Sequence, residues 1–252
     1  MSKIGGLIEG CIVVALGLAM TVLVRADNYW LYLHPKFKWL TFTAGIILVL
    51  VGATALLYNR RPNLARILVF LAFSTLASIG YFLPNPTSSA TSGPPEESAS
   101  KKESRIVLDG QEYIKINLGE LYSISEKELE EERAAHYVTR GIVKRNPELD
   151  EIGQFVLVRV FIWCCFADAV AVGFRVQGDQ PEEFLDGQWV RVFGKLKGLP
   201  SSQSAEPTVQ VKGILAKALH KTDGIFASRV EKIEPPPIPF MFEFRKSEPY
   251  AY

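Results

Sequence analysis

Three long apolar stretches open the chain and constrain its fold more than any other feature. They cover residues 4–24, 39–57 and 67–83. Each is close to the length of about 17 to 25 residues that a helix needs to cross a bilayer. The first stretch is not followed by the small-residue cleavage site of a secretory signal peptide. The sequence therefore predicts a multi-span α-helical membrane region over residues 1–84, with three transmembrane helices and the lipid bilayer as a partner.

The basic residues of the membrane region suggest an orientation. The connection 59–66 carries Arg60, Arg61 and Arg66, and basic loops remain preferentially in the cytoplasm. Three spans would then place the C-terminal domain outside the cytoplasm, so we expect a multi-pass protein of the plasma membrane with an extracytoplasmic C-terminal domain. The loop 25–38 on the other side also has three basic residues, which leaves the opposite orientation open.

A change of composition separates the membrane region from the rest of the chain. Residues 85–104 are rich in Pro, Ser and Thr and poor in large apolar side chains. Such a segment cannot bury enough apolar surface to offset the entropy lost on ordering. We therefore predict a disordered linker over residues 85–104.

Alternating apolar residues and turn formers dominate the second half of the chain. Short strands are expected within 106–116, and the pattern Ser125-Glu126-Lys127-Glu128 predicts the start of a helix that runs to Ala135. Further strands are predicted at 137–143, 155–164, 170–176, 189–196, 209–219 and 226–233. This number of strands suits a mainly-β domain over 105–235, an OB-like small antiparallel barrel, with an SH3-like barrel as the alternative. Residues 236–252 are expected to form an extended C-terminal tail that either docks elsewhere or packs back on the barrel.

Two adjacent cysteines and a carboxylate form the candidate site. Cys164, Cys165 and Asp168 lie in an apolar run at the end of a predicted strand. Thiolates favour soft metals such as Zn²⁺ or Cu(I), so the three residues are candidate metal or ligand contacts, with His136 or His220 as further ligands. Alternation along a regular strand would separate the two thiols, however, and both would then be buried as small hydrophobes. Asp168 would in that case only cap a turn.

Four motifs resemble one family of bacterial membrane proteins. They are Tyr32-Leu33-His34-Pro35, Cys164-Cys165-Phe166-Ala167-Asp168-Ala169, Gly187-Gln188-Trp189-Val190-Arg191-Val192 and Pro249-Tyr250-Ala251-Tyr252. With these motifs the chain resembles uncharacterised permease subunits of the YcgQ type, which carry a domain of unknown function. The resemblance implies small multispan proteins with a soluble β-domain, encoded beside a larger permease. A larger multispan permease subunit is therefore the expected partner.

Charge and motif content narrow the class of function. Residues 105–252 carry 19 basic and 22 acidic side chains, which is not the basic footprint that a nucleic-acid partner requires. The sequence contains neither a G-x-S-x-G elbow nor an H-E-x-x-H motif. We therefore expect a non-enzymatic accessory subunit of a permease whose barrel docks on a partner or presents a ligand or metal. The alternatives are a membrane-tethered thiol redox protein and a metal-binding chaperone, both of which would use Cys164 and Cys165.

Overall fold

The computed structural model describes residues 2–58, 104–127, 130–178, 181–200 and 209–252. The chain forms two compact units, Met1–Ser88 and Ser89–Tyr252. The third predicted span, 67–83, lies outside the described residues. The predicted linker, 85–104, does so too, apart from Ser104.

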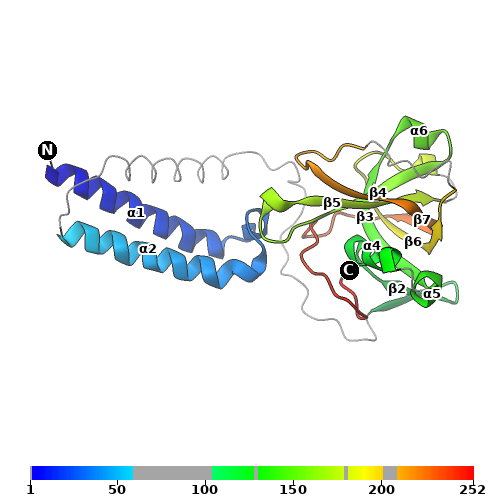
Figure 1. Ribbon diagram of the computed structural model, residues 1–252, viewed down its shortest axis with the longest axis horizontal. Coiled ribbons are helices and arrows are strands. Elements are labelled where there is room, and N and C mark those ends of the chain that lie inside the picture. The colour runs from blue at the N-terminus through cyan, green and yellow to red at the C-terminus, as the bar shows by residue number, and fades with distance from the viewer. Residues whose placement is uncertain (1, 59–103, 128–129, 179–180, 201–208) are drawn as a thin grey trace. The chain divides into compact units, whose positions relative to one another are not determined.

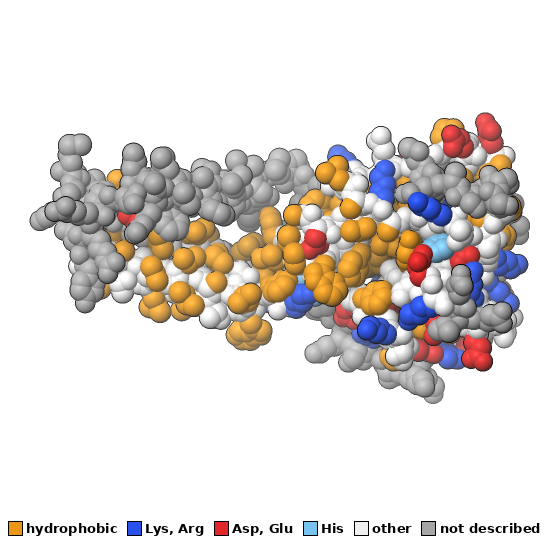
Figure 2. All heavy atoms as spheres, in the orientation of Figure 1, with side chains coloured by type: hydrophobic (Ala, Val, Ile, Leu, Met, Phe, Trp, Pro, Cys, Tyr) orange, Lys and Arg blue, Asp and Glu red, His pale blue; other side chains and the backbone are white. Residues whose placement is uncertain are grey.

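The first unit contains two long apolar helices, α1 (Ser2–Arg25) and α2 (Lys38–Tyr58), joined through the short 3-10 helices η1 (Tyr29–Leu31) and η2 (Pro35–Phe37) (Figure 1). Two windows within this hairpin, Gly6–Arg25 and Pro35–Leu57, are long and apolar enough to cross a membrane. Hydrophobic side chains cover the visible face of both helices (Figure 2). Membrane spans and a signal sequence near the N-terminus both have these properties, so the two helices are candidate spans.

Glycines let the two helices approach closely. A Cβ atom added at Gly17 would lie 2.6 Å from the carbonyl oxygen of Gly45, and one added at Gly45 would lie 2.9 Å from the carbonyl oxygen of Gly17. Small residues at such crossings allow the backbones of membrane helices to pack against each other. The composition of the hairpin therefore favours a tightly packed pair.

Replacing Gly17 by valine is expected to destabilise the α1–α2 pair by about 1–3 kcal/mol, because the added side chain meets backbone that cannot move aside. Thermal unfolding of the full chain in mild detergent, followed by far-ultraviolet circular dichroism, measures this change. Leu18→Val is the matched control, since Leu18 is exposed. Equal melting of the two variants would contradict the role of the glycine contact.

The second unit is built on a closed barrel of five strands. These are β3 (His136–Lys144), β4 (Gln154–Phe161), β5 (Val170–Gln177), β6 (Trp189–Gly198) and β7 (Ala216–Lys232). Their order around the barrel is β3-β4-β5-β7-β6, and β6 pairs with β3 to close it. All these pairings are antiparallel except the parallel pair β5–β7. A hairpin of β1 (Arg105–Leu108) and β2 (Gln111–Lys115) extends the sheet at β3.

The structure confirms the predicted small barrel and corrects three of its predicted strands. The segments 209–219 and 226–233 do not form two strands, because a single strand, β7, runs from Ala216 to Lys232. The predicted strand 155–164 ends at Phe161, before the two cysteines. Gly194 lies at a register shift between β6 and β7, where an added Cβ would meet the carbonyl oxygen of Phe226 at 2.4 Å. Only glycine allows the two strands to approach so closely at this bulge.

The predicted helix start at Ser125 is wrong. Ser125 lies inside α4 (Leu118–Lys127), where it is buried and donates a hydrogen bond to the carboxylate of Asp223. The helix is instead preceded by Asn117, whose side-chain oxygen accepts from the N–H of Glu120 at 2.9 Å. The Glu120 carboxylate returns to the N–H of Asn117 at 3.5 Å, which makes Asn117 and Glu120 a capping box. A second short helix, α5 (Glu130–Ala134), follows α4.

Apolar side chains from every barrel strand fill the core. The largest buried members include Phe155, Leu157 and Phe174, and α4 adds Leu118 and Leu121. These residues come from alternate positions of the strands, as expected when one face of each strand points into a barrel. Three further short helices, α6 (Pro147–Asp150), η3 (Phe166–Asp168) and η4 (Pro181–Glu183), lie in the connections.

The C-terminal tail packs back on the barrel. The N–H of Met241 donates to the carbonyl oxygen of Val160 at 2.8 Å, and the N–H of Ile162 donates to that of Met241 at 3.0 Å. The tail thereby adds a short parallel bridge beside β4. Further along, Glu248 forms an ion pair with Arg105 at 2.7 Å. Of the two alternatives for this segment, the structure shows packing against its own domain.

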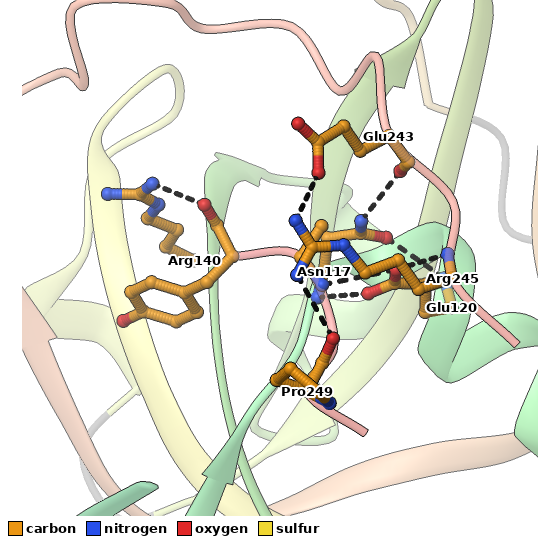
Figure 3. A network of polar contacts seen from close by, with 8 residues as sticks. Asn117, Glu120, Arg140, Glu243, Arg245 and Pro249 are labelled. Carbon is orange, nitrogen blue, oxygen red and sulfur yellow. Dashed lines mark hydrogen bonds and ion pairs between the residues drawn. The ribbon is translucent and has the colours of Figure 1, made fainter. Parts of the chain in front are cut away.

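Glu120 holds the last part of the tail (Figure 3). This buried carboxylate accepts hydrogen bonds from the N–H groups of Arg245 at 2.6 Å and Ala251 at 3.1 Å. Burial raises the pKa of Glu120 to about 7, although the N–H donors and Arg245 act in the opposite direction. The folded domain therefore binds this proton more tightly than the unfolded chain does.

The pKa of Glu120 predicts that the second unit loses stability as the pH rises. Below about pH 4.5 both states are protonated, and between that value and about 7 the unfolded state ionises first. We expect a loss of about 2 kcal/mol between about pH 5 and pH 7 from this group. Urea denaturation of the full chain at several pH values measures it. The slope should be smaller in Glu120→Gln, which cannot ionise, and an unchanged slope would show that other groups cause it.

Candidate functional site

The loop between β4 and β5 positions the candidate residues. Residues 162–169 close this hairpin, because Phe161 pairs with Val170 at its end. The chain leaves the strand at Ile162 and turns through η3, which contains Asp168. The expected alternation of Cys164 and Cys165 along a strand is therefore wrong, since neither residue is in one.

Asp168 is the reason that the strand stops. Its carboxylate accepts from the N–H groups of Trp163 at 2.9 Å, Cys164 at 2.7 Å and Cys165 at 3.3 Å. These three amides would otherwise continue the β-ladder, so the carboxylate folds the backbone into a turn. The turn-capping role that the sequence suggested for Asp168 is confirmed.

The same turn brings the two thiols together. The Sγ atoms of Cys164 and Cys165 are 3.6 Å apart, too far for a disulfide, and both side chains are half-buried. Ligand atoms of Cys164, Cys165 and Asp168 all lie within 4.8 Å of one another. The structure therefore unites the three residues that the sequence proposed as one site.

Hydrogen bonds favour a protonated Cys164 thiol and an ionised Asp168 carboxyl. The hydrogen bond to Asp168, and then that to Cys165, raises the pKa of the Cys164 thiol to about 11. Burial acts to raise the pKa of Asp168, but the bonds from the Cys164 thiol and the three N–H groups hold it below its usual value. The cluster thus contains a carboxylate with a protonated thiol beside it.

Neither candidate histidine belongs to this group. The ring of His220 is buried between α4 and the barrel, stacked on Phe174 at 5.2 Å, and its Nδ1 accepts from the N–H of Asp223. His136 packs edge-on against Tyr113 at 5.4 Å. Among the residues that the structure describes, the potential metal ligands that converge are Cys164, Cys165 and Asp168.

The sequence did not predict the roles of two charged residues, Glu120 and Arg159. Glu120 follows Asn117 by three positions, so the capping box was visible in the sequence but was assigned to Ser125 instead. Arg159 is buried in β4 with 4% of its surface exposed. Its signal was a lone arginine within the apolar run Phe155 to Phe161, because a charged residue there must be accommodated by specific partners.

Comparison with protein families places this loop and most of the barrel in one family. Residues 86–226 match the model of the DUF1980 C-terminal domain. The chain belongs to this family. The match covers more than half of the chain and includes the Cys164, Cys165 and Asp168 loop of the DUF1980 C-terminal domain. Among curated proteins, no sequence matches the chain.

Proposed function

We propose that this protein is a non-enzymatic, membrane-anchored accessory subunit of a permease whose barrel binds and presents a soft metal ion. The observation that carries the proposal is the convergence of Cys164, Cys165 and Asp168 within 4.8 Å on one loop. Two apolar helices at the N-terminus support membrane anchoring. The DUF1980 C-terminal domain supplies the metal-presenting part.

The barrel is best classified as OB-like. Its strand order β3-β4-β5-β7-β6, with β6 returning to β3 and β5 parallel to β7, corresponds to the Greek-key order of the OB fold. Proteins with this fold commonly use loops at one end of the barrel to hold a ligand. Those ligand loops join the first and second or the fourth and fifth strands, whereas the loop 162–169 joins the second and third, so its binding role rests on its own residues.

The spacing of the thiols suits one shared metal ion. Tetrahedral Zn²⁺ with sulfur ligands at about 2.3 Å holds two sulfurs about 3.8 Å apart, and the observed Sγ–Sγ distance is 3.6 Å. The three N–H donors orient the Asp168 carboxylate toward the thiols, as a supporting shell does in metal sites. Zinc or Cu(I) would replace the thiol protons, and the open positions would be left for a partner's ligands.

The raised pKa of Cys164 is unfavourable for thiol redox chemistry. A thiol that attacks disulfides is usually activated by a lowered pKa. Here the adjacent carboxylate raises the pKa of the Cys164 thiol to about 11. The thiol therefore remains protonated at neutral pH until a metal displaces the proton.

Exposed aromatic residues beside the cysteines support docking on a permease. Trp163 is 64% exposed and Phe166 is 40% exposed, on either side of Cys164 and Cys165. Large apolar side chains in this position are typical of protein contacts. If the segment 67–83 also crosses the plasma membrane and the N-terminus is cytoplasmic, the barrel lies outside the cytoplasm in a multi-pass protein, which fused topology reporters would test.

Metal binding tests the central claim. The full chain in mild detergent, titrated with Zn²⁺ and separately with Cu(I) against a competing chelator, is expected to take up about one ion per chain. Cys164→Ser and Cys165→Ser should each weaken binding by about tenfold or more, because each removes one soft ligand. Binding should also strengthen with rising pH as the thiols lose their protons.

Cys11→Ser is the matched control, since Cys11 lies in α1, outside the cluster. It should bind metal as the wild type does. Absence of stoichiometric binding of either metal by the wild type, or equal binding by Cys164→Ser, would refute the metal site. Co-purification of a multispan membrane protein with the tagged chain tests the partner, and Trp163→Ala should reduce its recovery.

A further inference from the structure

A second connection lies beside the cysteine loop at the same end of the barrel. The parallel strands β5 and β7 pair at their first residues. The segments that precede them, 162–169 and 209–215, therefore lie at one barrel end. A Cβ atom added at Gly213 would lie 3.7 Å from the ring of Phe166, which shows that the two segments are neighbours.

The lysine turn, residues 211–217, is both apolar and cationic. Leu215 has 98% of its surface exposed, the largest fraction among the large apolar residues that the structure describes. Lys212 and Lys217 flank it and are exposed as well. Residues 209–222 contain no Asp or Glu, and within the described part of the chain neither lysine forms an ion pair. The lysine turn therefore has positive charge beside an exposed leucine.

The backbone of the lysine turn fixes the exposure of Leu215. The N–H of Ile214 donates to the carbonyl oxygen of Val211 at 3.0 Å and closes a β-turn. Gly213 has a φ of 78° in this turn, which glycine adopts without strain. Ile214 is buried, with 7% of its surface exposed, and holds the turn on the barrel. Leu215 is therefore exposed in a closed turn and not at a loose end.

We infer that the lysine turn contacts the surface of an anionic lipid bilayer, with Leu215 in the interface and the two lysines at the headgroups. Lysine is attracted to acidic headgroups, and its apolar stem can lie along the acyl boundary. Protein interfaces are depleted in lysine and enriched in Trp and Phe. The residue types therefore favour a lipid partner for the lysine turn and a protein partner for the neighbouring Trp163 and Phe166.

Anchoring by the chain's own helices makes so small a contact sufficient. The helices α1 and α2 contain two candidate membrane spans, and the inference rests on the membrane anchoring proposed above. A single leucine with a pair of lysines would hold a free domain only weakly on a bilayer. A tethered domain meets the same bilayer at a high effective concentration. The contact would hold the cysteine loop at the membrane surface, where a permease in the same bilayer can reach it.

A fluorescent label at Ala216→Cys tests the contact in the purified full chain, with one chain in each lipid nanodisc. Neither a second copy nor a permease is then present. Cys11→Ser, Cys164→Ser and Cys165→Ser make the label specific and also remove the thiol ligands, so the result does not depend on metal binding. A spin-labelled lipid should quench the label by about twofold or more in discs that contain phosphatidylglycerol. Leu215→Ser and high salt should each reduce the quenching.

Leu185→Cys is the matched control position for the label. Leu185 is 71% exposed and precedes β6, whose first residues pair with the far end of β7. A label there should not be quenched. The double variant Lys212→Gln and Lys217→Gln should lower the quenching at Ala216 in anionic discs only, and not in discs of phosphatidylcholine alone. In the wild type without a label, trypsin should cut after these two lysines more slowly in anionic than in neutral discs.

The outcomes separate the lipid contact from the anchoring on which it rests. Equal quenching at both label positions, or none at Ala216, in chains that co-elute with the discs would overturn the lipid contact and leave the anchoring intact. A chain that does not co-elute with the discs would overturn both. An Ala216 label that responds only when a multispan protein is bound would assign the lysine turn to a protein partner and would also overturn the inference.

Discussion

Glu120→Ala is expected to release the C-terminal tail and to destabilise the second unit by about 3 kcal/mol. The carboxylate accepts from the N–H groups of Arg245 and Ala251 and caps α4 at Asn117. Removing it leaves buried donors without acceptors, and each such donor costs about 1–3 kcal/mol. Part of that cost is recovered when the tail lifts and its N–H groups reach water. Urea denaturation of the full chain measures the change in stability.

The released tail also gives a second readout. Trypsin should cut faster after Arg245 and Lys246 in Glu120→Ala, because these bonds become accessible. Glu243→Ala is the matched control, since Glu243 accepts from Arg245 in the same network but is about half-exposed. An exposed ion pair contributes about 0–1 kcal/mol, so this variant should resemble the wild type. If the two variants proved equally stable and equally resistant to trypsin, Glu120 would not be what holds the tail.

Phe174→Ala should have the larger effect, a loss of about 3–5 kcal/mol. Phe174 is completely buried on β5. Its ring stacks on His220 at 5.2 Å and lies 6.0 Å from Tyr122 of α4. Truncation would therefore leave a cavity where α4 packs on the barrel, and neighbours held by separate elements cannot all collapse into it. Thermal and urea unfolding of the full chain measure the loss.

Leu185→Ala serves as the comparison for this core truncation, because Leu185 is 71% exposed. Exposed apolar positions usually change stability by about 0.5 kcal/mol or less. A loss below about 1 kcal/mol in Phe174→Ala would mean that the helix and the barrel do not form one core. The same variant should loosen His220, whose ring would lose its stacking partner.

Local sequence patterns predicted the elements whose own residues carry a clear hydrophobic pattern. Alternation located β3, β5 and β6 to within a few residues. Apolar length predicted α1 and α2. These signals succeed because hydrophobic periodicity acts through the nearest residues.

The errors occurred where a distant partner decides the local structure. The residue types of Ser125 and Glu128 match a capping box. The Ser125 hydroxyl instead donates to the carboxylate of Asp223, nearly a hundred positions away in the chain. The prediction of a strand as far as Cys164 was wrong, because the Asp168 carboxylate accepts from three N–H groups that a continued strand would use in its ladder. Both cases show a side-chain hydrogen bond overriding a pattern of hydrophobicity.

The sequence by itself determined the apolar helices, the small barrel and the identity of Cys164, Cys165 and Asp168 as candidate ligands, because these depend on residue type and spacing. Only the tertiary structure decided that the two thiols face each other 3.6 Å apart, since that depends on a turn rather than on a strand. It also decided that the tail returns to Glu120 and that Pro239 of the tail contacts the buried Arg159. Burial and charge compensation are properties of surroundings assembled from distant segments, and for that reason no single stretch of sequence contains them.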